Sequence, residues 1–121
     1  MLLYVALGSA IGGVARYLLG GLAQRLFDTT FPVGTLIINV SGSLLLGAFI
    51  RYATETPTLS PDLRAFLTIG LCGGYTTFST FSFESVRLME EGAGLGALAN
   101  LAGSVAAGLA AAAVGLGLGL L

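Results

Sequence analysis

The segment 70–82, GLCGGYTTFSTFS, combines features that an ordinary membrane helix lacks. Gly73 and Gly74 are adjacent, and each glycine disfavours a helix by about 1 kcal/mol relative to alanine. Five hydroxyl-bearing residues and two phenylalanines follow: Tyr75, Thr76, Thr77, Ser79, Thr80, Phe78 and Phe81. The uncharged run 65–83 is long enough to cross a bilayer, so we expect a membrane helix that breaks at this glycine pair. Exposed backbone groups at such depth persist only inside protein or beside water.

The groups beside the break suit either an ion or the helix itself. Half-helix ends carry partial charges and exposed backbone groups, which makes them ion sites. Thr76 or Thr77 is expected to cap the second half-helix. The alternative is a kinked helix whose hydroxyls bond back to their own backbone. The density of hydroxyl and phenyl groups favours an ion site.

The composition predicts an integral membrane protein and excludes several function classes. The 121 residues are 55% hydrophobic and 9% charged, with a mean hydropathy of +0.95, whereas soluble domains carry about 25% charged residues. The net charge of −1 provides no basic patch for nucleic acid. With no histidine and with Cys72 as the single cysteine, the chain lacks an internal disulfide, a Cys/His zinc site and a histidine-based triad. We therefore expect no enzyme.

Hydrophobic patterning predicts an all-α fold with one domain, residues 1–121, and four membrane spans. The spans cover about residues 2–23, 33–52, 63–89 and 95–120. Ser60, Pro61 and Asp62 are typical of a helix start. Gly8 and Gly12 are expected to let another helix approach the first span closely.

A few polar residues interrupt these spans. Arg16 lies in the first span, where we expect it to reach the interface or pair with backbone carbonyls. Thr35, Asn39 and Ser43 form a stripe along the second span at four-residue spacing. Asn39 is nearly mid-span, and its amide serves either helix–helix contact or a pore lining. The fourth span repeats the spacing with Asn100, Ser104 and Gly108.

The arginines near the helix ends give no orientation. Arg51 and Arg64 lie on the side of the two termini, and Arg25 and Arg87 lie on the other side. The two sides carry equal numbers of arginines, so the positive-inside rule predicts no preferred orientation. A chain that inserts both ways can pair as an inverted-topology homodimer, as fused halves do in many transporters. Four helices of this size are too few to enclose a site alone, which also favours a dimer.

The chain resembles the Fluc (CrcB) family of fluoride channels. The matching residues are Gly13 to Tyr17, Gly34 to Leu36 with Asn39 and Gly42, Gly70, Cys72 to Gly74, and Thr76 to Ser82. The match runs through all four expected spans in order, and the third-span motif is the most specific part. The resemblance implies a dual-topology homodimer with two fluoride pores in a prokaryotic inner or plasma membrane.

The resemblance also implies roles for individual residues. The backbone carbonyls of Gly73 and Thr76 would hold a structural sodium ion at the two-fold axis, and the ring edges of Phe78 and Phe81 would line the pores. The remaining roles fall to other polar side chains. Nearby polar groups would be Asn39, Ser79 and Thr80, the fourth-helix polar track would include Asn100 and Ser104, and the first-helix arginine would be the structural Arg16. Gly108 departs from that track because it offers no hydroxyl.

The residue types suit fluoride independently of the resemblance. Fluoride is small and tightly hydrated, so a pore must replace its water with donors such as asparagine amides and hydroxyls. A phenylalanine edge is the positive part of the ring quadrupole and can face an anion. A path without lysine or arginine binds the ion weakly enough for it to leave, and a buried monovalent cation raises the potential for anions without titrating.

Two other functions compete with this interpretation. A small dual-topology multidrug exporter coupled to protons needs a titratable carboxylate inside the membrane. Here the first, second and fourth spans lack one, and Glu84 lies near an exit with Arg87 available to pair with it. A non-conducting membrane assembly subunit would use the small-residue packing but would not need the phenylalanine and hydroxyl cluster.

Overall fold

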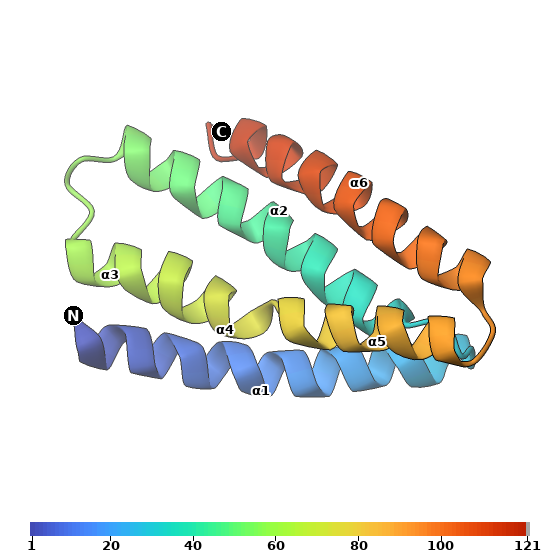
Figure 1. Cartoon of the computed structure of the whole chain (residues 1–121). Helices are drawn as coiled ribbons and strands as arrows, with labels where there is room; N and C mark the ends of the chain where they lie inside the picture. The colour runs from blue at the N-terminus through green and yellow to red at the C-terminus, as the bar shows by residue number, and fades with distance from the viewer. Residues whose placement is uncertain (121) are drawn as a thin grey trace.

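A computed structural model describes residues 1–120, which are all helix and connecting loop, without a strand in that range (Figure 1). Within this range three helices are long and apolar enough to cross a membrane: α1 (Leu2–Phe27), α2 (Val33–Glu55) and α6 (Gly94–Leu118). They match the predicted spans 2–23, 33–52 and 95–120 except at their ends. The prediction of an all-helical membrane protein is confirmed.

The predicted span 63–89 forms two collinear halves. The first half stacks α3 (Pro61–Ala65), the π-helical segment η1 (Phe66–Cys72) and α4 (Gly73–Tyr75), and the second half is α5 (Phe78–Glu90). Ser60 caps the start as predicted, because its Oγ accepts a hydrogen bond from the Leu63 N–H at 3.1 Å. Figure 1 shows the two halves lying end to end, and the first half packs on α1, whereas α5 packs on α6.

The helix breaks at Thr76 and Thr77, so the predicted position at Gly73 and Gly74 is wrong. Both threonines are extended, with φ, ψ of −88°, 158° and −149°, 116°. Gly73 keeps helical angles of −63° and −39°. Gly74 instead serves close packing, because an added Cβ would lie 2.8 Å from the Ser9 Cα of α1. The glycine preference for irregular backbone is overridden here by the close approach of two helices.

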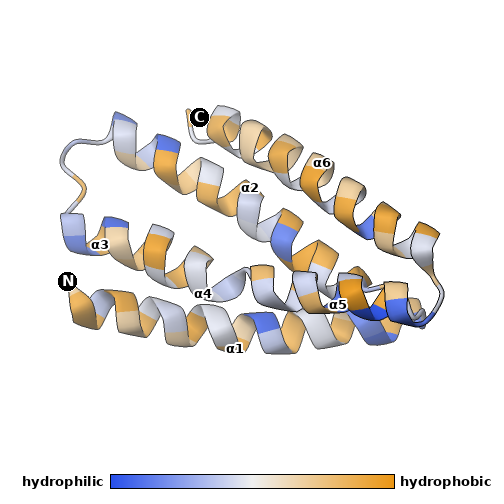
Figure 2. Ribbon diagram, in the orientation of Figure 1, coloured by the Kyte–Doolittle hydropathy of each residue, from blue (hydrophilic) through white to orange (hydrophobic). Residues whose placement is uncertain are grey.

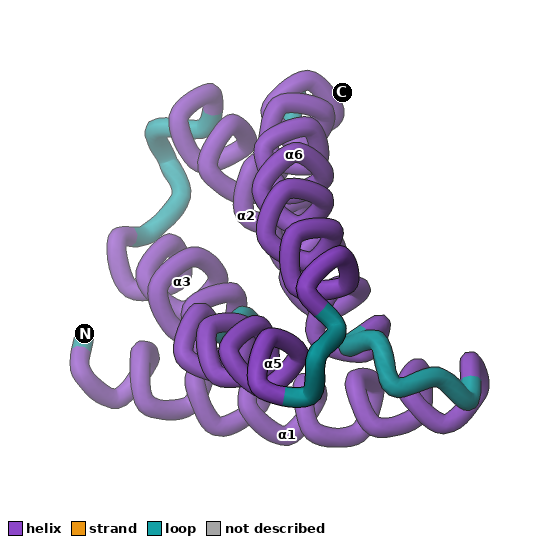
Figure 3. The backbone as a smooth tube through the Cα atoms, turned by 45° about the vertical axis from the view of Figure 1, so that its right-hand side comes forward, coloured by secondary structure: helices purple, strands orange, loops and turns teal. Residues whose placement is uncertain are grey.

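The helices associate chiefly in two pairs, α2 with α6 and α1 with the first half of the broken helix (Figure 3). The second half, α5, packs on α6 and so links the two pairs. Glycines make both contacts close. A Cβ on Gly8 would lie 2.6 Å from the Phe66 carbonyl oxygen, and one on Gly12 would lie 2.9 Å from the Tyr75 nitrogen. The predicted close approach at these two glycines is confirmed. In the other pair, Gly115 packs against the backbone of α2 in the same way.

Apolar surface covers the outside of the bundle. Figure 2 shows hydrophobic residues along the helices and hydrophilic ones mainly at their ends. Leu18 on α1 and Leu109 on α6 are 59% and 69% exposed in the single chain. Both chain ends lie toward the end of the bundle that holds the α2–α3 loop, and the α1–α2 and α5–α6 loops lie at the other (Figure 1). These exposed apolar faces fit lipid or another apolar surface, as a multi-pass membrane protein requires.

Candidate functional site

The break in the third helix is held by the side chain of Asn39, from the second turn of α2. Asn39 Oδ1 accepts a hydrogen bond from the Thr77 N–H at 2.8 Å, and Asn39 Nδ2 donates to the Thr77 carbonyl oxygen at 3.1 Å. The extended conformation of Thr77 presents both groups to α2, as a strand residue presents them to its neighbour. Asn39 therefore joins two helices, and it also lines a cavity, so both expected roles remain compatible with its position.

A second contact from α2 braces the other side of the break. Ser41 Oγ lies 2.9 Å from the hydroxyl of Tyr75, the last residue of α4. Gly42 leaves room for Thr76, whose methyl group occupies the place a Cβ would take. One short stretch of α2 thus fixes the residues on both sides of the opening. Sequence reasoning missed the Ser41–Tyr75 contact, because a pairing over 34 residues leaves no local signal.

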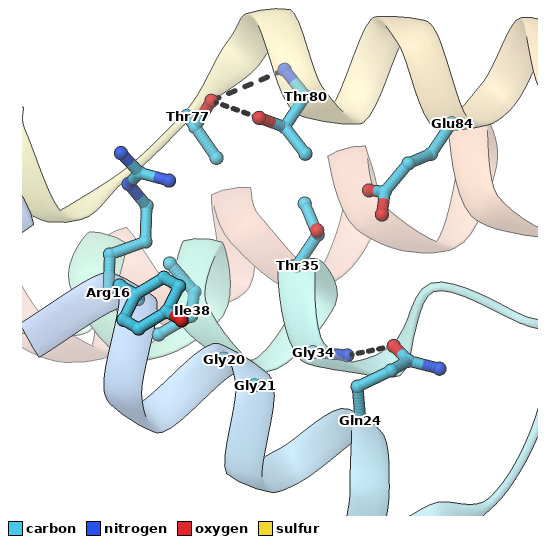
Figure 4. A pocket seen from close by; sticks show the side chains of 11 residues that line it. Arg16, Gly20, Gly21, Gln24, Gly34, Thr35, Ile38, Thr77, Thr80 and Glu84 are labelled. Carbon is cyan, nitrogen blue, oxygen red and sulfur yellow. Dashed lines mark hydrogen bonds between the residues drawn. The ribbon is translucent and has the colours of Figure 1, made fainter.

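The second half-helix begins with a hydroxyl cluster. Thr77, rather than Thr76, caps α5: its Oγ1 accepts from the Thr80 N–H at 3.3 Å and donates to Thr80 Oγ1 at 3.0 Å (Figure 4). Ser79 Oγ lies 3.4 Å from Thr77 Oγ1. Thr76 Oγ1 donates back to the Cys72 carbonyl at 3.0 Å. The positive end of the α5 dipole therefore points toward the break.

A cavity of about 240 Å³, which we call the phenylalanine cavity, opens beside the break. Phe78 and Phe81 face one another across 5.9 Å between ring centroids, with their planes tilted by 52°. Phe81 is 9% exposed and Phe78 is 79% exposed in the single chain. The remaining lining is mostly polar or small: Asn39, Gly42, Ser43, Leu46, Thr76 and Thr77. The structure thus brings the predicted Asn39, Phe78 and Phe81 together.

A second cavity of about 260 Å³, which we call the arginine cavity, lies on the other side of Thr77 (Figure 4). Arg16, Thr35, Thr80 and Glu84 line it, so Thr35 and Asn39 of the predicted stripe face different cavities. Within residues 1–120, Arg16 Nε and Glu84 Oε1 are buried without a hydrogen-bond partner. Both residues line this cavity, whereas no charged side chain lines the phenylalanine cavity.

Of the two roles expected for Arg16, pairing with a backbone carbonyl is not found for its Nε within residues 1–120, and reaching the interface stays a prediction. The expectation for Glu84 is wrong. We expected Glu84 to pair with Arg87, yet Arg87 Nε lies 3.6 Å from Glu91 Oε1 instead. The four-residue spacing on α5 favours Glu91, and Glu84 turns toward the arginine cavity.

A buried polar chain joins α5 to α6. Ser85 Oγ donates to the Phe81 carbonyl at 2.8 Å, Asn100 Nδ2 donates to Ser85 Oγ at 2.9 Å, and Ser104 Oγ donates to Asn100 Oδ1 at 3.2 Å. Ser85 and Asn100 are 2% and 1% exposed. Sequence reasoning missed Ser85 as a partner, although its spacing of four residues from Phe81 was visible.

The predicted site residues therefore fall into groups. Asn39, Phe78 and Phe81 share the phenylalanine cavity, and Arg16 and Thr80 share the arginine cavity. Ser79 and Ser104 line neither cavity, and their predicted contact with an ion stays a prediction. Gly73 lies in the last helical turn before the break, and Thr76 is the first residue of the break. In Figure 4, Thr77 and Thr80 lie on the α5 side of the arginine cavity, opposite Gly34 and Gln24.

Comparison with known proteins places the chain in a family. Residues 3–116 match the model described as "CrcB-like protein, Camphor Resistance (CrcB)". A "Fluoride-specific ion channel FluC" of Geobacter sp. (strain M21) is 45% identical over 115 residues, which cover 95% of this chain and 93% of the relative. Proteins with the same name are 45% identical over 118 residues in Chloroflexus aurantiacus, covering 98% and 94%, and 47% over 105 residues in Geobacter sulfurreducens, covering 87% and 85%. With a match over nearly its whole length, this chain belongs to the CrcB-like protein family.

Proposed function

We propose that this chain is a fluoride-selective ion channel that lets fluoride leave the cell passively and so lowers cytoplasmic fluoride. The observation that carries the proposal is the phenylalanine cavity, where two phenyl rings and an asparagine meet at a break in a membrane helix. The relatives named fluoride-specific channels, which match most of this chain, support the same function.

The lining of the phenylalanine cavity suits a strongly hydrated anion. The Ser43 hydroxyl can replace water as a donor, and the second N–H of the Asn39 amide is not used by Thr77. The hydroxyls of Thr76 and Thr77 already donate to the Cys72 carbonyl and to Thr80 Oγ1. The rings of Phe78 and Phe81 supply weakly positive edges rather than full charges. No lysine or arginine lines this cavity, so the anion is held weakly enough to move on.

The arginine cavity adds a hydrated entrance to this path. Buried polar atoms such as Arg16 Nε and Glu84 Oε1 are costly unless something bonds to them. The cavity has several polar side chains in its lining and, at about 260 Å³, is large enough for several waters. Thr77 lines both cavities, so this residue lies between the arginine cavity and the phenylalanine cavity.

The working unit we propose is an inverted-topology homodimer of four-span chains, in which α3–α4 and α5 together make the third crossing. Phe78 is 79% exposed although it lines the cavity, so a single chain leaves this cavity unfinished. A second copy would cover it and the apolar face around it. The balanced arginines, Arg51 and Arg64 against Arg25 and Arg87, allow the two copies to insert in opposite directions.

The topology proposal predicts that the C-terminus is found on both sides of the membrane. Single cysteines placed near the C-terminus, in a Cys72→Ser background, should react with a membrane-impermeant maleimide in intact cells to about half of the level seen in broken cells. Adding two lysines to the α2–α3 loop should shift this balance, because loop charge sets orientation. Labelling confined to one side in the parent chain would reject the inverted dimer.

We further propose a structural sodium ion at the break, held by the Gly73 and Thr76 carbonyls. Neutral carbonyl oxygens suit a hard monovalent cation, and they do not titrate. Among residues 1–120 there is no cluster of three or more His, Cys, Asp or Glu, so the proposed ligands are neutral backbone oxygens. Two carbonyls from one chain leave a cation under-coordinated, and a two-fold partner would double the number. When bound, the ion would supply positive potential near the anion path.

The function itself is tested by fluoride efflux from liposomes that contain the purified protein, with chloride as the control ion. Selective efflux of fluoride supports the proposal. Absence of fluoride efflux from a protein that elutes as a single folded species would reject it.

A further inference from the structure

The break depends on one backbone N–H that has changed its acceptor. In a continuous helix the N–H of residue 77 would donate to the carbonyl of residue 73. Here the Thr77 N–H donates to Asn39 Oδ1 at 2.8 Å. The preceding Thr76 N–H still donates to the Cys72 carbonyl at 3.1 Å, so the helix ladder ends at this step. The Gly73 carbonyl is therefore the first one that loses its helical donor, and Asn39 is the group that takes the donor away.

The same hydrogen bond also orients the Thr76 carbonyl. The Thr76 C=O and the Thr77 N–H belong to one peptide plane, and no peptide bond within residues 1–120 is cis. In a planar trans peptide these two groups point in opposite directions. Because the N–H points to Asn39 on α2, the Thr76 carbonyl oxygen points away from α2. One side-chain acceptor thus leaves the Gly73 carbonyl without its helical donor and sets the direction of the Thr76 carbonyl.

The second bond of Asn39 makes this arrangement rigid. Asn39 Nδ2 donates to the Thr77 carbonyl at 3.1 Å, so the amide holds Thr77 from both of its backbone groups. Only a primary amide offers an acceptor and a donor side by side at this reach without a charge. Gly42, one turn along α2, leaves the space that Thr76 needs to stay extended. The residue types at positions 39 and 42 are both explained by this geometry.

We propose that Asn39 is the positioning residue of the cation site: its paired hydrogen bonds with Thr77 keep the Gly73 carbonyl out of the helix ladder and direct the Thr76 carbonyl away from α2. This inference rests on the proposed sodium site, and it explains why the two carbonyls are available to a cation. Asn39 also lines the phenylalanine cavity, so the same amide links the cation site to the anion path. The role is mechanical, and Asn39 itself does not contact the cation.

The test is the sodium dependence of thermal stability in the purified dimer. A ligand that binds only the folded state raises the melting temperature with its concentration. Dimers are exchanged by long incubation into N-methylglucamine buffer, titrated with sodium and melted. The parent should gain stability with sodium. In Asn39→Leu the sodium concentration for half of this gain should rise at least tenfold, because the carbonyls are no longer preset.

Ser41→Ala is the matched control. It removes another hydrogen bond from α2 to the broken helix, at the Tyr75 hydroxyl, but leaves the peptide between Thr76 and Thr77 untouched. Its melting temperature should fall, while its sodium response should stay within about threefold of the parent. Asn39→Asp retains an oxygen for the Thr77 N–H and should also retain a sodium response, which a general loss of packing at position 39 would not explain.

The outcomes separate the two proposals. A parent that responds to sodium and an Asn39→Leu dimer that responds equally would overturn the positioning role and leave the sodium site standing. A parent that conducts fluoride but shows no sodium response would overturn both. Should Asn39→Leu yield no dimer, Asn39→Ala is measured in its place: an at least tenfold rise in the sodium concentration for half of the gain supports the inference, and a response within threefold of the parent in an intact dimer contradicts it.

Discussion

Replacing Phe78 or Phe81 by isoleucine is expected to reduce fluoride flux by at least about tenfold in each case, while the protein still assembles. An aliphatic side chain has no ring edge to turn toward an anion. Losing an edge interaction of about 1.5 kcal/mol raises the barrier to permeation by that amount, which slows the flux about tenfold. The measurement is initial fluoride efflux per protein in liposomes, with the elution position of each variant recorded in detergent.

The exposure of the two rings separates conduction from packing. Phe78 is 79% exposed in the single chain, so its substitution costs little packing within the chain, whereas Phe81 is 9% exposed and its substitution costs about 1 kcal/mol or slightly more. A lost flux in Phe78→Ile with unchanged assembly therefore points to the ring edge. Phe83, 64% exposed and outside both cavities, is the control, and Phe83→Ile should conduct like the parent. If Phe78→Ile and Phe81→Ile also conduct like the parent, these rings are packing residues.

Gly12→Ala is expected to lower the stability of the protein by more than about 2 kcal/mol. An added Cβ would lie 2.9 Å from the Tyr75 nitrogen and closer still to the Leu71 carbonyl oxygen. Both are backbone atoms, so α1 and the broken helix must separate, and overpacking of this kind costs about 1–3 kcal/mol or more. Because Tyr75 adjoins the break, the same shift should also disturb the phenylalanine cavity. The measurement is the fraction that survives heating and elutes at the parent position.

The neighbouring Gly13 provides the control for this prediction. A Cβ on Gly13 meets nothing within 4 Å, so Gly13→Ala should be neutral or stabilising by up to about 1 kcal/mol through helix propensity. The contrast isolates the close approach from any general effect of glycine in α1. Equal survival of Gly12→Ala and Gly13→Ala would show that α1 and the broken helix are not held as closely as described.

Local patterns in the sequence predict the elements well, because their causes are local. Apolar length predicts the helices, and Ser60 with Pro61 predicts the start of the third. Thr77 was one of two expected caps, and the hydrogen bond from the Thr80 N–H decides between them. Gly8 and Gly12 signal a close helix contact through their spacing alone. Each of these features depends on residues within one or two helical turns.

The features that sequence reasoning misplaced depend on contacts between distant segments. The helix opens at Thr76 and Thr77 because Asn39, 38 residues away, captures a backbone N–H. Gly74 remains helical because it packs on Ser9. The Ser85–Asn100 contact joins two helices across a turn. The low helix propensity of glycine predicted the right region for the break, but the hydrogen bond between Asn39 and Thr77 determines the residue at which the helix opens.

The most direct test of the central claim compares two anions in one preparation. Liposomes with the purified protein are loaded with potassium fluoride or potassium chloride, and efflux is started with valinomycin so that potassium carries the balancing charge. The account predicts rapid fluoride efflux on addition of valinomycin, detected by a fluoride electrode, with no proton gradient required and no chloride efflux above that of protein-free liposomes. Equal efflux of both anions, or fluoride efflux that appears only with a proton gradient, would contradict a passive fluoride-selective channel.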